Sequence, residues 1–395
     1  MFTALTAFIL EYKFVFLFYL AIIIFLIIKR KQVEIQSKII VLLRTKWGLR
    51  WMDTFSEKHR EWIILLAYIG VGAGYVGLVF ISYILIKNLI TLFTTPEAVS
   101  GVSIVLPGIN VPGLGVLPFW YWLLSIFIIA VVHEFSHGIV ARAHNVTIKN
   151  TGIVLLGPII GAFVEPNEKK LRQEKDIVQY SILAAGSFSN ILLAIVALIA
   201  LTLVFTPLQQ TMVQPTGFTF DTYVPGDYPF SKVGIAPGTL ITGINGQSVT
   251  EFQQFSDELT MKAPGQVIQV QTTQQTYDIT LAQNPDNPQR GFLGIAQIRN
   301  EVEVKETFKS GMLNPVYIVV DWVTGFLRWL FLLSLGIGLF NLLPLPIVDG
   351  GRMAQVFLHK WKGRLVGEKR YRQVGLFFLL VLVLNLIAPL IMKLF

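Results

Sequence analysis

The chain has 395 residues, of which 53% are hydrophobic and only 14% are charged, and its formal net charge is +8. Soluble domains carry about 25% charged residues, so this composition indicates a polytopic membrane protein with a smaller water-soluble part. Cysteine is absent, which excludes disulfides and thiolate metal ligands and leaves His, Asp and Glu as candidate ligands.

Six apolar segments are long enough to cross a hydrocarbon core, which needs about 20 helical residues. The loops after the first, third and fifth segments are rich in Lys and Arg. By the positive-inside rule these loops are cytoplasmic, which predicts that both termini and the alternate loops are extracytoplasmic. We therefore expect an integral protein of the cell membrane, without nucleic-acid binding, because the basic residues follow the membrane loops. The six segments are residues 8–28, 62–85, 118–141, 178–205, 317–343 and 374–395.

Residues 1–116 form an N-terminal region with the first two spans and two unusual connections. Residues 32–60 mix basic and apolar side chains, so they either lie on the inner membrane surface as an amphipathic helix or serve only as a basic connector. Residues 101–117 are apolar but interrupted by Gly and Pro, which favour turns or short strands over helix. We expect them to form an outer loop that dips toward the helix bundle.

The third span carries the sequence His133-Glu134-Phe135-Ser136-His137. Histidines four residues apart lie on nearly the same face of a helix, so both imidazoles can bind one zinc ion. Glu134 beside them can take a proton from a zinc-bound water. Ionisable groups at bilayer depth are costly, which makes a functional role the default hypothesis. The alternative is a pair of histidines that are hydrogen-bonded inside a helix bundle.

Residues 152–164 follow the third span and are rich in β-branched side chains. The dipeptide Gly157-Pro158 suits a turn, so we predict two short strands on the cytoplasmic side. An edge strand near a zinc site can pair with an extended peptide by strand addition, which makes Gly157 and Gly161 candidate substrate contacts. A purely structural hairpin is the alternative. Residues 117–205 then form the first part of a catalytic core.

Residues 206–310 are more polar than the rest and contain short β-like runs, which predicts an extracytoplasmic domain of normal size. Residues 234–246 combine a glycine turn, a strand and an Asn-Gly hairpin turn. A helix is expected at 252–259, and strands are expected at 266–272 and 276–281. The pattern resembles a circularly permuted PDZ domain of the kind found in membrane and periplasmic proteases. PDZ domains bind peptides by strand addition, whereas some serve as size filters, and the sequence leaves both roles open.

The fifth span ends in a segment that interrupts the helix and then supplies a carboxylate. Pro344 and Pro346 cannot continue a regular helix, so backbone groups and Asn341 can face a cavity there. The loop charges place Asp349 at the same cytoplasmic depth as the two histidines. Asp349 is therefore the natural third zinc ligand, with a fourth position left for water. The alternative for Asp349 is a turn residue before Gly350-Gly351. Residues 311–395 complete the expected catalytic core.

The two motifs together resemble the motif pair of the site-2 protease family of intramembrane zinc metalloproteases. The order of elements is also similar from residue 117 to the C-terminus. The resemblance implies that His133, His137 and Asp349 bind one Zn²⁺ and that Glu134 is the catalytic base.

The resemblance also implies substrate contacts. Asn341, with Pro344 and Pro346, matches the family's asparagine and proline pair, which implies a contact with the substrate backbone. The fourth span contains Ala184-Ala185-Gly186-Ser187-Phe188-Ser189-Asn190, similar to a family segment with small residues and an asparagine. Asn190 is therefore a further candidate for substrate binding, and helix packing through small residues is the alternative.

The expected fold is an α-helical polytopic membrane protein of about six transmembrane helices with an inserted extracytoplasmic PDZ-like α+β domain. The expected function is hydrolysis of peptide bonds within or near the transmembrane helices of membrane-protein substrates, in regulated intramembrane proteolysis. We also expect contact with the lipid bilayer, and of the PDZ-like domain with a peptide or substrate ectodomain.

Two alternatives to this function stay open. One is a membrane zinc protease of another H-E-x-x-H class, whose third ligand is a downstream glutamate, but the fifth and sixth spans contain no Glu. An Asp349→Ala variant that keeps its zinc would favour that class. The other is a non-proteolytic metal-binding scaffold or transporter with a PDZ-like module. Glu134 argues against it, because metal binding alone needs no base beside the first histidine.

Overall fold

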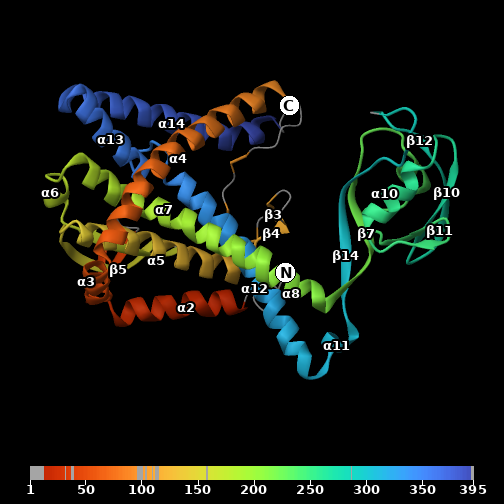
Figure 1. Cartoon of the computed structure of the whole chain (residues 1–395), viewed down its shortest axis with the longest axis horizontal. Coiled ribbons are helices and arrows are strands. Elements are labelled where there is room, and N and C mark those ends of the chain that lie inside the picture. Colours follow the sequence, from red (N-terminus) through yellow and green to blue (C-terminus); the bar gives the residue numbers. More distant parts are fainter. Residues whose placement is uncertain are drawn as a thin grey trace. The chain divides into compact units, whose positions relative to one another are not determined.

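The computed structural model of the chain describes residues 13–31, 33–36, 40–95, 101–102, 105–108, 110–111, 115–156, 159–285 and 287–392. The chain forms two compact units, one made of Met1–Leu201 with Gly325–Phe395 and the other of Thr202–Thr324. The first unit is mainly helical and the second contains a β-sheet (Figure 1). The predicted PDZ-like domain, 206–310, lies within the second unit.

The described part of the chain contains five helices that are long and apolar enough to cross a membrane. A sixth apolar helix, α2, is shorter, and residues 8–12 of the first predicted span lie outside the described residues. The protein is therefore a polytopic helical membrane protein, as its composition predicts. The helices at these segments are α2 (Lys13–Ile28), α4 (Arg60–Thr94), α5 (Phe119–Ala143), α7 (Asp176–Ala200), α12 (Asn314–Phe340) and α14 (Arg364–Met392).

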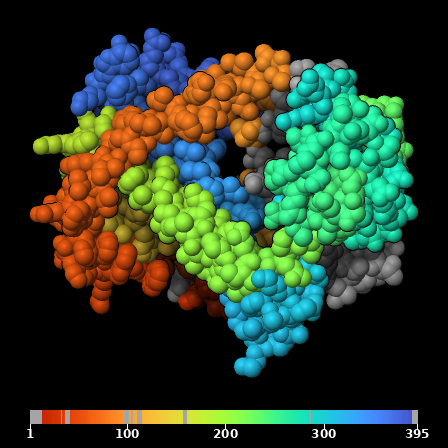
Figure 2. Space-filling model, turned by 45° about the vertical axis from the view of Figure 1, so that its right-hand side comes forward, coloured from red at the N-terminus to blue at the C-terminus, as the bar shows by residue number. Residues whose placement is uncertain are grey.

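Small residues let the helices of the first unit approach closely. Helix α7 packs between α4 and α5 (Figure 1). A Cβ atom at Gly74 of α4 would lie 3.2 Å from the Cβ of Ala184 on α7. At Gly138 of α5 it would lie 2.8 Å from the sulfur of Met52. Such small side chains are typical of helix contacts in membranes. Figure 2 shows α4 in orange and α7 in yellow-green, with residues in the lighter blue that α12 has in Figure 1 visible between them.

The N-terminal connection forms part of the core sheet. Residues 32–60 do not form one amphipathic helix or a plain connector; they contain two strands and a short helix. Strand β2 pairs with β5, which extends the predicted hairpin at 152–164 to a four-stranded antiparallel sheet in the order β1-β2-β5-β6. Branched side chains favour this strand pairing over helix. The bounds are β1 (Val33–Gln36), β2 (Ile40–Thr45), α3 (Leu49–Lys58), β5 (Ile148–Leu156), β6 (Ile159–Pro166) and α6 (Glu168–Leu171).

Proline and glycine residues explain the shape of two other connections between the helices. The segment 101–117 contains the short strands β3 (Asn110–Val111) and β4 (Gly115–Val116), as its turn residues predict. At the end of the fourth span, a π-helical turn (Leu201–Phe205) leads into α8 (Thr206–Met212). Pro207 has no N–H to donate to the carbonyl four residues earlier, which explains why the α-helical ladder widens there.

The second unit contains the expected PDZ-like arrangement of a sheet with two helices. Its strands follow the order β11-β10-β8-β7-β14, and β9 pairs with β8. The core is aromatic and aliphatic, with Phe218, Phe220 and Phe255 fully buried. The predicted Asn-Gly turn joins β8 to β9, where Asn245 and Gly246 have φ values of 51° and 82°, typical of a type I′ hairpin.

The predicted helix at 252–259 and strands at 266–272 and 276–281 are confirmed as α10, β10 and β11. The elements that follow α8 are β7 (Val213–Tyr223), α9 (Pro229–Val233), β8 (Ile241–Ile244), β9 (Gln247–Ser248), α10 (Phe252–Thr260), β10 (Val267–Thr272), β11 (Thr276–Thr280), β12 (Ala282–Gln283), β13 (Gly291–Phe292), β14 (Ile295–Val304), α11 (Glu306–Lys309) and a 3₁₀ turn (Gly311–Leu313).

Candidate metal and catalytic site

Helix α5 carries the two histidines on one face. His133 is buried and His137 is half-buried, and their Nε2 atoms are 3.2 Å apart. The helix continues without a break from Phe119 to Ala143, so the four-residue spacing alone sets this proximity.

Asp349 reaches the same point from a different part of the chain. Helix α12 ends at Phe340, and α13 (Asp349–Lys362) begins with the carboxylate in its first turn. The N–H of Gly350 donates a hydrogen bond of 2.7 Å to the carbonyl of Asn341, which closes the intervening loop. A Cβ atom at Gly351 would lie 1.7 Å from the carbonyl oxygen of Leu345, so only glycine fits this approach.

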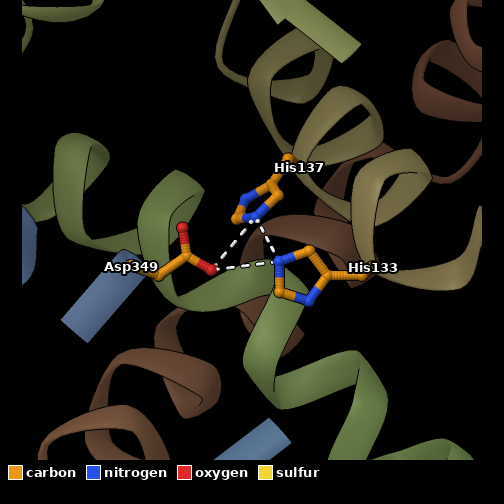
Figure 3. A group of neighbouring side chains, drawn as sticks. All are labelled: His133, His137 and Asp349. Atoms are coloured by element: carbon orange, nitrogen blue, oxygen red, sulfur yellow. Dashed lines mark hydrogen bonds and ion pairs between the residues drawn. The ribbon is translucent and has the colours of Figure 1, made fainter. Parts of the chain in front are cut away.

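The three candidate ligands converge on one small space (Figure 3). Asp349 Oδ2 lies 3.1 Å from His133 Nε2 and 3.3 Å from His137 Nε2. Zinc bonds of about 2.0–2.1 Å in a tetrahedral centre place ligand atoms roughly 3.3 Å apart, which matches the observed separations. Asp349 Oδ2 is buried and receives no hydrogen bond of normal geometry from the described residues. The donor set therefore fits a zinc ion, and the part of the chain that the structure describes contains no other such group.

Glu134 lies beside this group and contacts the four-stranded sheet. The backbone N–H of Val164, in β6, donates a hydrogen bond of 3.1 Å to Glu134 Oε2. Strand β6 is at the edge of the sheet and pairs with β5 on its other side. The free edge of β6 therefore runs next to the Glu134 carboxylate.

Helix α7 forms the wall behind the histidines and contains residues that sequence reasoning did not single out. The carbonyl of Ile182 lies 2.6 Å from His137 Nδ1. A Cβ atom at Gly186 would lie 2.4 Å from His137 Nε2 and 2.6 Å from His133 Nε2, so glycine is required there. The small-residue run 184–187 was the available clue to Gly186, whereas no side-chain pattern points to the backbone groups of Ile182 and Val164.

The predicted substrate residues occupy different environments. Pro344 is buried and Pro346 is exposed in the loop before Asp349, and Asn341 is half-buried. Asn190 is fully buried, with its amide nitrogen 3.0 Å from His133 Nδ1. Gly161 is half-buried in β6, opposite Val154. Gly157 lies outside the described residues. The roles of these residues in substrate binding stay predictions.

Comparison with known proteins decides the family. The model of peptidase family M50 matches residues 121–384, about two thirds of the chain. The chain belongs to peptidase family M50. The predicted resemblance to site-2 proteases is thereby confirmed, and the matched region contains both halves of the candidate site. It leaves α2 and α4 outside, although both helices lie in the same structural unit as the site.

Individual relatives are distant. An uncharacterized protein of Methanocaldococcus jannaschii is 24% identical over 90% of this chain and 87% of its own length. The zinc metalloprotease RasP of Oceanobacillus iheyensis is 24% identical over 40% of this chain and 48% of its own length. Protease RseP of Yersinia pestis is 25% identical over 35% of this chain and 42% of its own length. The matches to the two named proteases thus span less than half of their lengths.

Solved structures are similar to part of the chain. One of them is the PDZ domain of an SdrC-like protein from Listeria monocytogenes, 26% identical, with a TM-score of 0.19 over 20% of this chain and 86% of that domain.

Proposed function

We propose that this M50 family member is an intramembrane zinc metalloprotease that hydrolyses peptide bonds within or near the transmembrane helices of membrane-protein substrates. The observation that carries this proposal is the convergence of His133, His137 and Asp349 beside Glu134. The apolar spans that supply these residues favour substrates that lie in the bilayer. By the charges of its loops, the site is on the cytoplasmic side and the PDZ-like domain is extracytoplasmic.

His133, His137 and Asp349 would hold the ion. A zinc ion bound there supplies Lewis-acid chemistry, which makes a water more acidic and polarises the scissile carbonyl. Glu134 accepts the proton of the attacking water and returns a proton to the leaving amine. The hydrogen bond from the Val164 N–H holds Oε2, which orients the carboxylate and leaves Oε1 as the base.

The edge of β6 is suited to hold the substrate next to this base. The carbonyls of a helical substrate are already hydrogen-bonded, so the substrate must unwind before it can be attacked. The Val164 N–H points away from β5 and toward Glu134. Other backbone N–H and C=O groups of β6 that point away from β5 therefore lie along the same edge. An unwound segment that adds to this edge recovers hydrogen bonds and lies beside the catalytic carboxylate. Asn341, in the loop before Asp349, can add a further contact.

The PDZ-like domain has a groove that suits an extended segment of a substrate ectodomain. A cavity of about 190 Å³ lies beside α10, β13 and the edge strand β14, and its lining combines apolar residues such as Phe252, Leu259 and Ile298 with the polar Ser256, Thr260 and Arg290. Apolar pockets beside a free strand edge bind peptides by strand addition.

A Glu134→Gln variant tests the proposal, because the amide cannot act as a base but keeps the size of the side chain. Membranes from cells that make the wild type should contain truncated single-span proteins that are missing from cells that make the variant. The rate of peptide-bond hydrolysis by the variant should be about 10²- to 10⁴-fold lower. The variant should still bind one zinc ion per chain. Glu165→Gln is the matched control, since Glu165 is next to Val164 but pairs with Arg44. Equal sets of truncated proteins with wild type and Glu134→Gln would refute proteolysis at this site.

A further inference from the structure

Asn190 is a buried polar residue in direct contact with a candidate ligand. Its side chain is fully buried on α7, and its amide nitrogen lies 3.0 Å from His133 Nδ1. The hydroxyl of Ser334, on α12, donates a hydrogen bond of 2.8 Å to the backbone carbonyl of Asn190. The position of Asn190 is thus held by a second helix, and its side chain is directed at the back of the His133 ring.

Only one of the two polar atoms of the Asn190 side-chain amide has a hydrogen-bond partner. Its Oδ1 atom is buried and has no hydrogen-bond partner among the described residues. Buried polar atoms are normally paired, and an unpaired one calls for an explanation. A rotation of the amide by 180° exchanges the positions of its oxygen and nitrogen with almost no change in shape.

The two orientations of the amide require different tautomers of His133. When Nδ2–H donates to Nδ1, a neutral imidazole carries its hydrogen on Nε2, which faces Asp349 Oδ2 at 3.1 Å. That Nε2 cannot bind a metal. When Oδ1 instead accepts from Nδ1–H, the lone pair of Nε2 is free and faces the other two candidate ligands. The second orientation pairs the oxygen with Nδ1–H and places the nitrogen where the oxygen had no partner, so the tautomer of His133 is what distinguishes the two orientations.

His137 provides an internal comparison. Its Nδ1 lies 2.6 Å from the carbonyl oxygen of Ile182. A carbonyl can only accept, so Nδ1 of His137 carries the hydrogen and Nε2 keeps its lone pair. The tautomer of His137 is therefore fixed by the Ile182 carbonyl. The Asn190 amide, in contrast, can pair with either tautomer of His133.

We propose that Asn190 is a positioning residue for the metal: its amide oxygen accepts the Nδ1–H of His133 and so keeps Nε2 of His133 available as a ligand. The inference rests on the proposed zinc site. Asn190 acts through His133 and touches neither the metal nor the substrate. This role differs from the substrate contact that the sequence resemblance implied for Asn190.

Three variants of the full-length protein in detergent test this role by zinc affinity, measured by competition with a chelator. Asn190→Asp keeps an acceptor oxygen, so its affinity should stay close to that of the wild type. Asn190→Leu has a similar size but no acceptor, and should bind zinc about 10- to 100-fold more weakly, as is typical when a partner of a ligating histidine is lost. Asn385→Leu is the matched control: Asn385 is also fully buried, but pairs with Asn88 and α14. Its zinc affinity should not change.

The outcomes separate this inference from the proposed function. Wild-type affinity in Asn190→Leu would show that Asn190 does not position His133. If Asn190→Asp lost as much affinity as Asn190→Leu, an acceptor oxygen would not be what matters. If Asn190→Leu fails to fold, the comparison of Asn190→Asp with the wild type decides, and a tenfold loss overturns the inference. A wild-type protein that binds no zinc would instead refute the metal site itself.

Discussion

His133 and His137 come from one unbroken helix, whereas Asp349 follows an irregular segment between α12 and α13. The spacing of two histidines along α5 is a local property of the helix, and needs no other element. The position of Asp349 depends on packing: the loop closes through Gly350 N–H to the Asn341 carbonyl, and Gly351 lies against Leu345. The positions of the two histidines thus follow from helical periodicity, whereas the position of Asp349 depends on close backbone contacts that only glycine permits.

Gly186→Ala should have the largest effect, because it acts on both histidines at once. The new methyl group would occupy the space 2.4 Å from His137 Nε2 and 2.6 Å from His133 Nε2. Zinc affinity should fall by at least about 100-fold, the upper end of losses seen around metal ligands. The metal-free protein should lose about 1–3 kcal/mol of stability through overpacking against the two rings, a loss reduced by the preference of a helix for alanine over glycine of about 1 kcal/mol.

Zinc content and thermal unfolding of the chelator-treated protein check this prediction. Gly72→Ala is the control, since Gly72 is also in the middle of a membrane helix, and nothing lies within 4 Å of a Cβ atom there. Full zinc occupancy in Gly186→Ala would show that α7 does not form the wall of the site.

Gly351→Ala tests the other half of the site, where only one ligand is displaced. Its methyl group would lie 1.7 Å from the backbone carbonyl oxygen of Leu345, so the loop before Asp349 has to shift. We expect a loss of zinc affinity of about tenfold and a loss of stability of about 1–3 kcal/mol, the usual range for overpacking.

Chelator competition and denaturation of the same preparation measure the two effects of Gly351→Ala. Gly336→Ala, on α12, has open space around the new methyl group, so it should leave zinc affinity unchanged and should not lower stability. If Gly351→Ala lost stability but bound zinc as tightly as the wild type, the loop before Asp349 would not be what positions its carboxylate for zinc binding.

Glu165→Gln should have the smallest effect, because Glu165 lies on β6 near the site but touches no candidate ligand. Hydrogen bonds from Asn150 and then Arg44 hold the pKa of the Glu165 carboxyl below its ordinary value of 4.5, against the opposite effect of partial burial. A lowered folded pKa contributes stability above 4.5, and this contribution is lost as the pH falls through the folded pKa.

The pair between Arg44 and Glu165 is about one-third exposed on both sides, so the contribution should stay below about 1 kcal/mol. Thermal unfolding near neutral pH should show Glu165→Gln slightly less stable than the wild type, and the difference should vanish in acid. A difference that is independent of pH would contradict the ionic origin. Zinc affinity should not change at either pH, in contrast to the two glycine variants.

The sequence by itself determined the membrane class, the positions of five spans, the helix that carries His133 and His137, and the β-rich domain. These features follow from composition, helical periodicity and turn residues such as Asn245-Gly246, all of which act over a few neighbouring positions. It also pointed to Asp349, through the loop charges that place it at the depth of the histidines and through the resemblance to a motif pair.

Only the tertiary structure decided which groups surround these residues. Residues 40–45 form strand β2 because they pair with β5, a pairing across more than a hundred residues that no local pattern of the segment encodes. The contacts of Glu134 with the Val164 N–H, and of His137 with the Ile182 carbonyl, use backbone groups that every residue possesses. A backbone group has no signature in the sequence, so its role emerges only when packing brings it to the site.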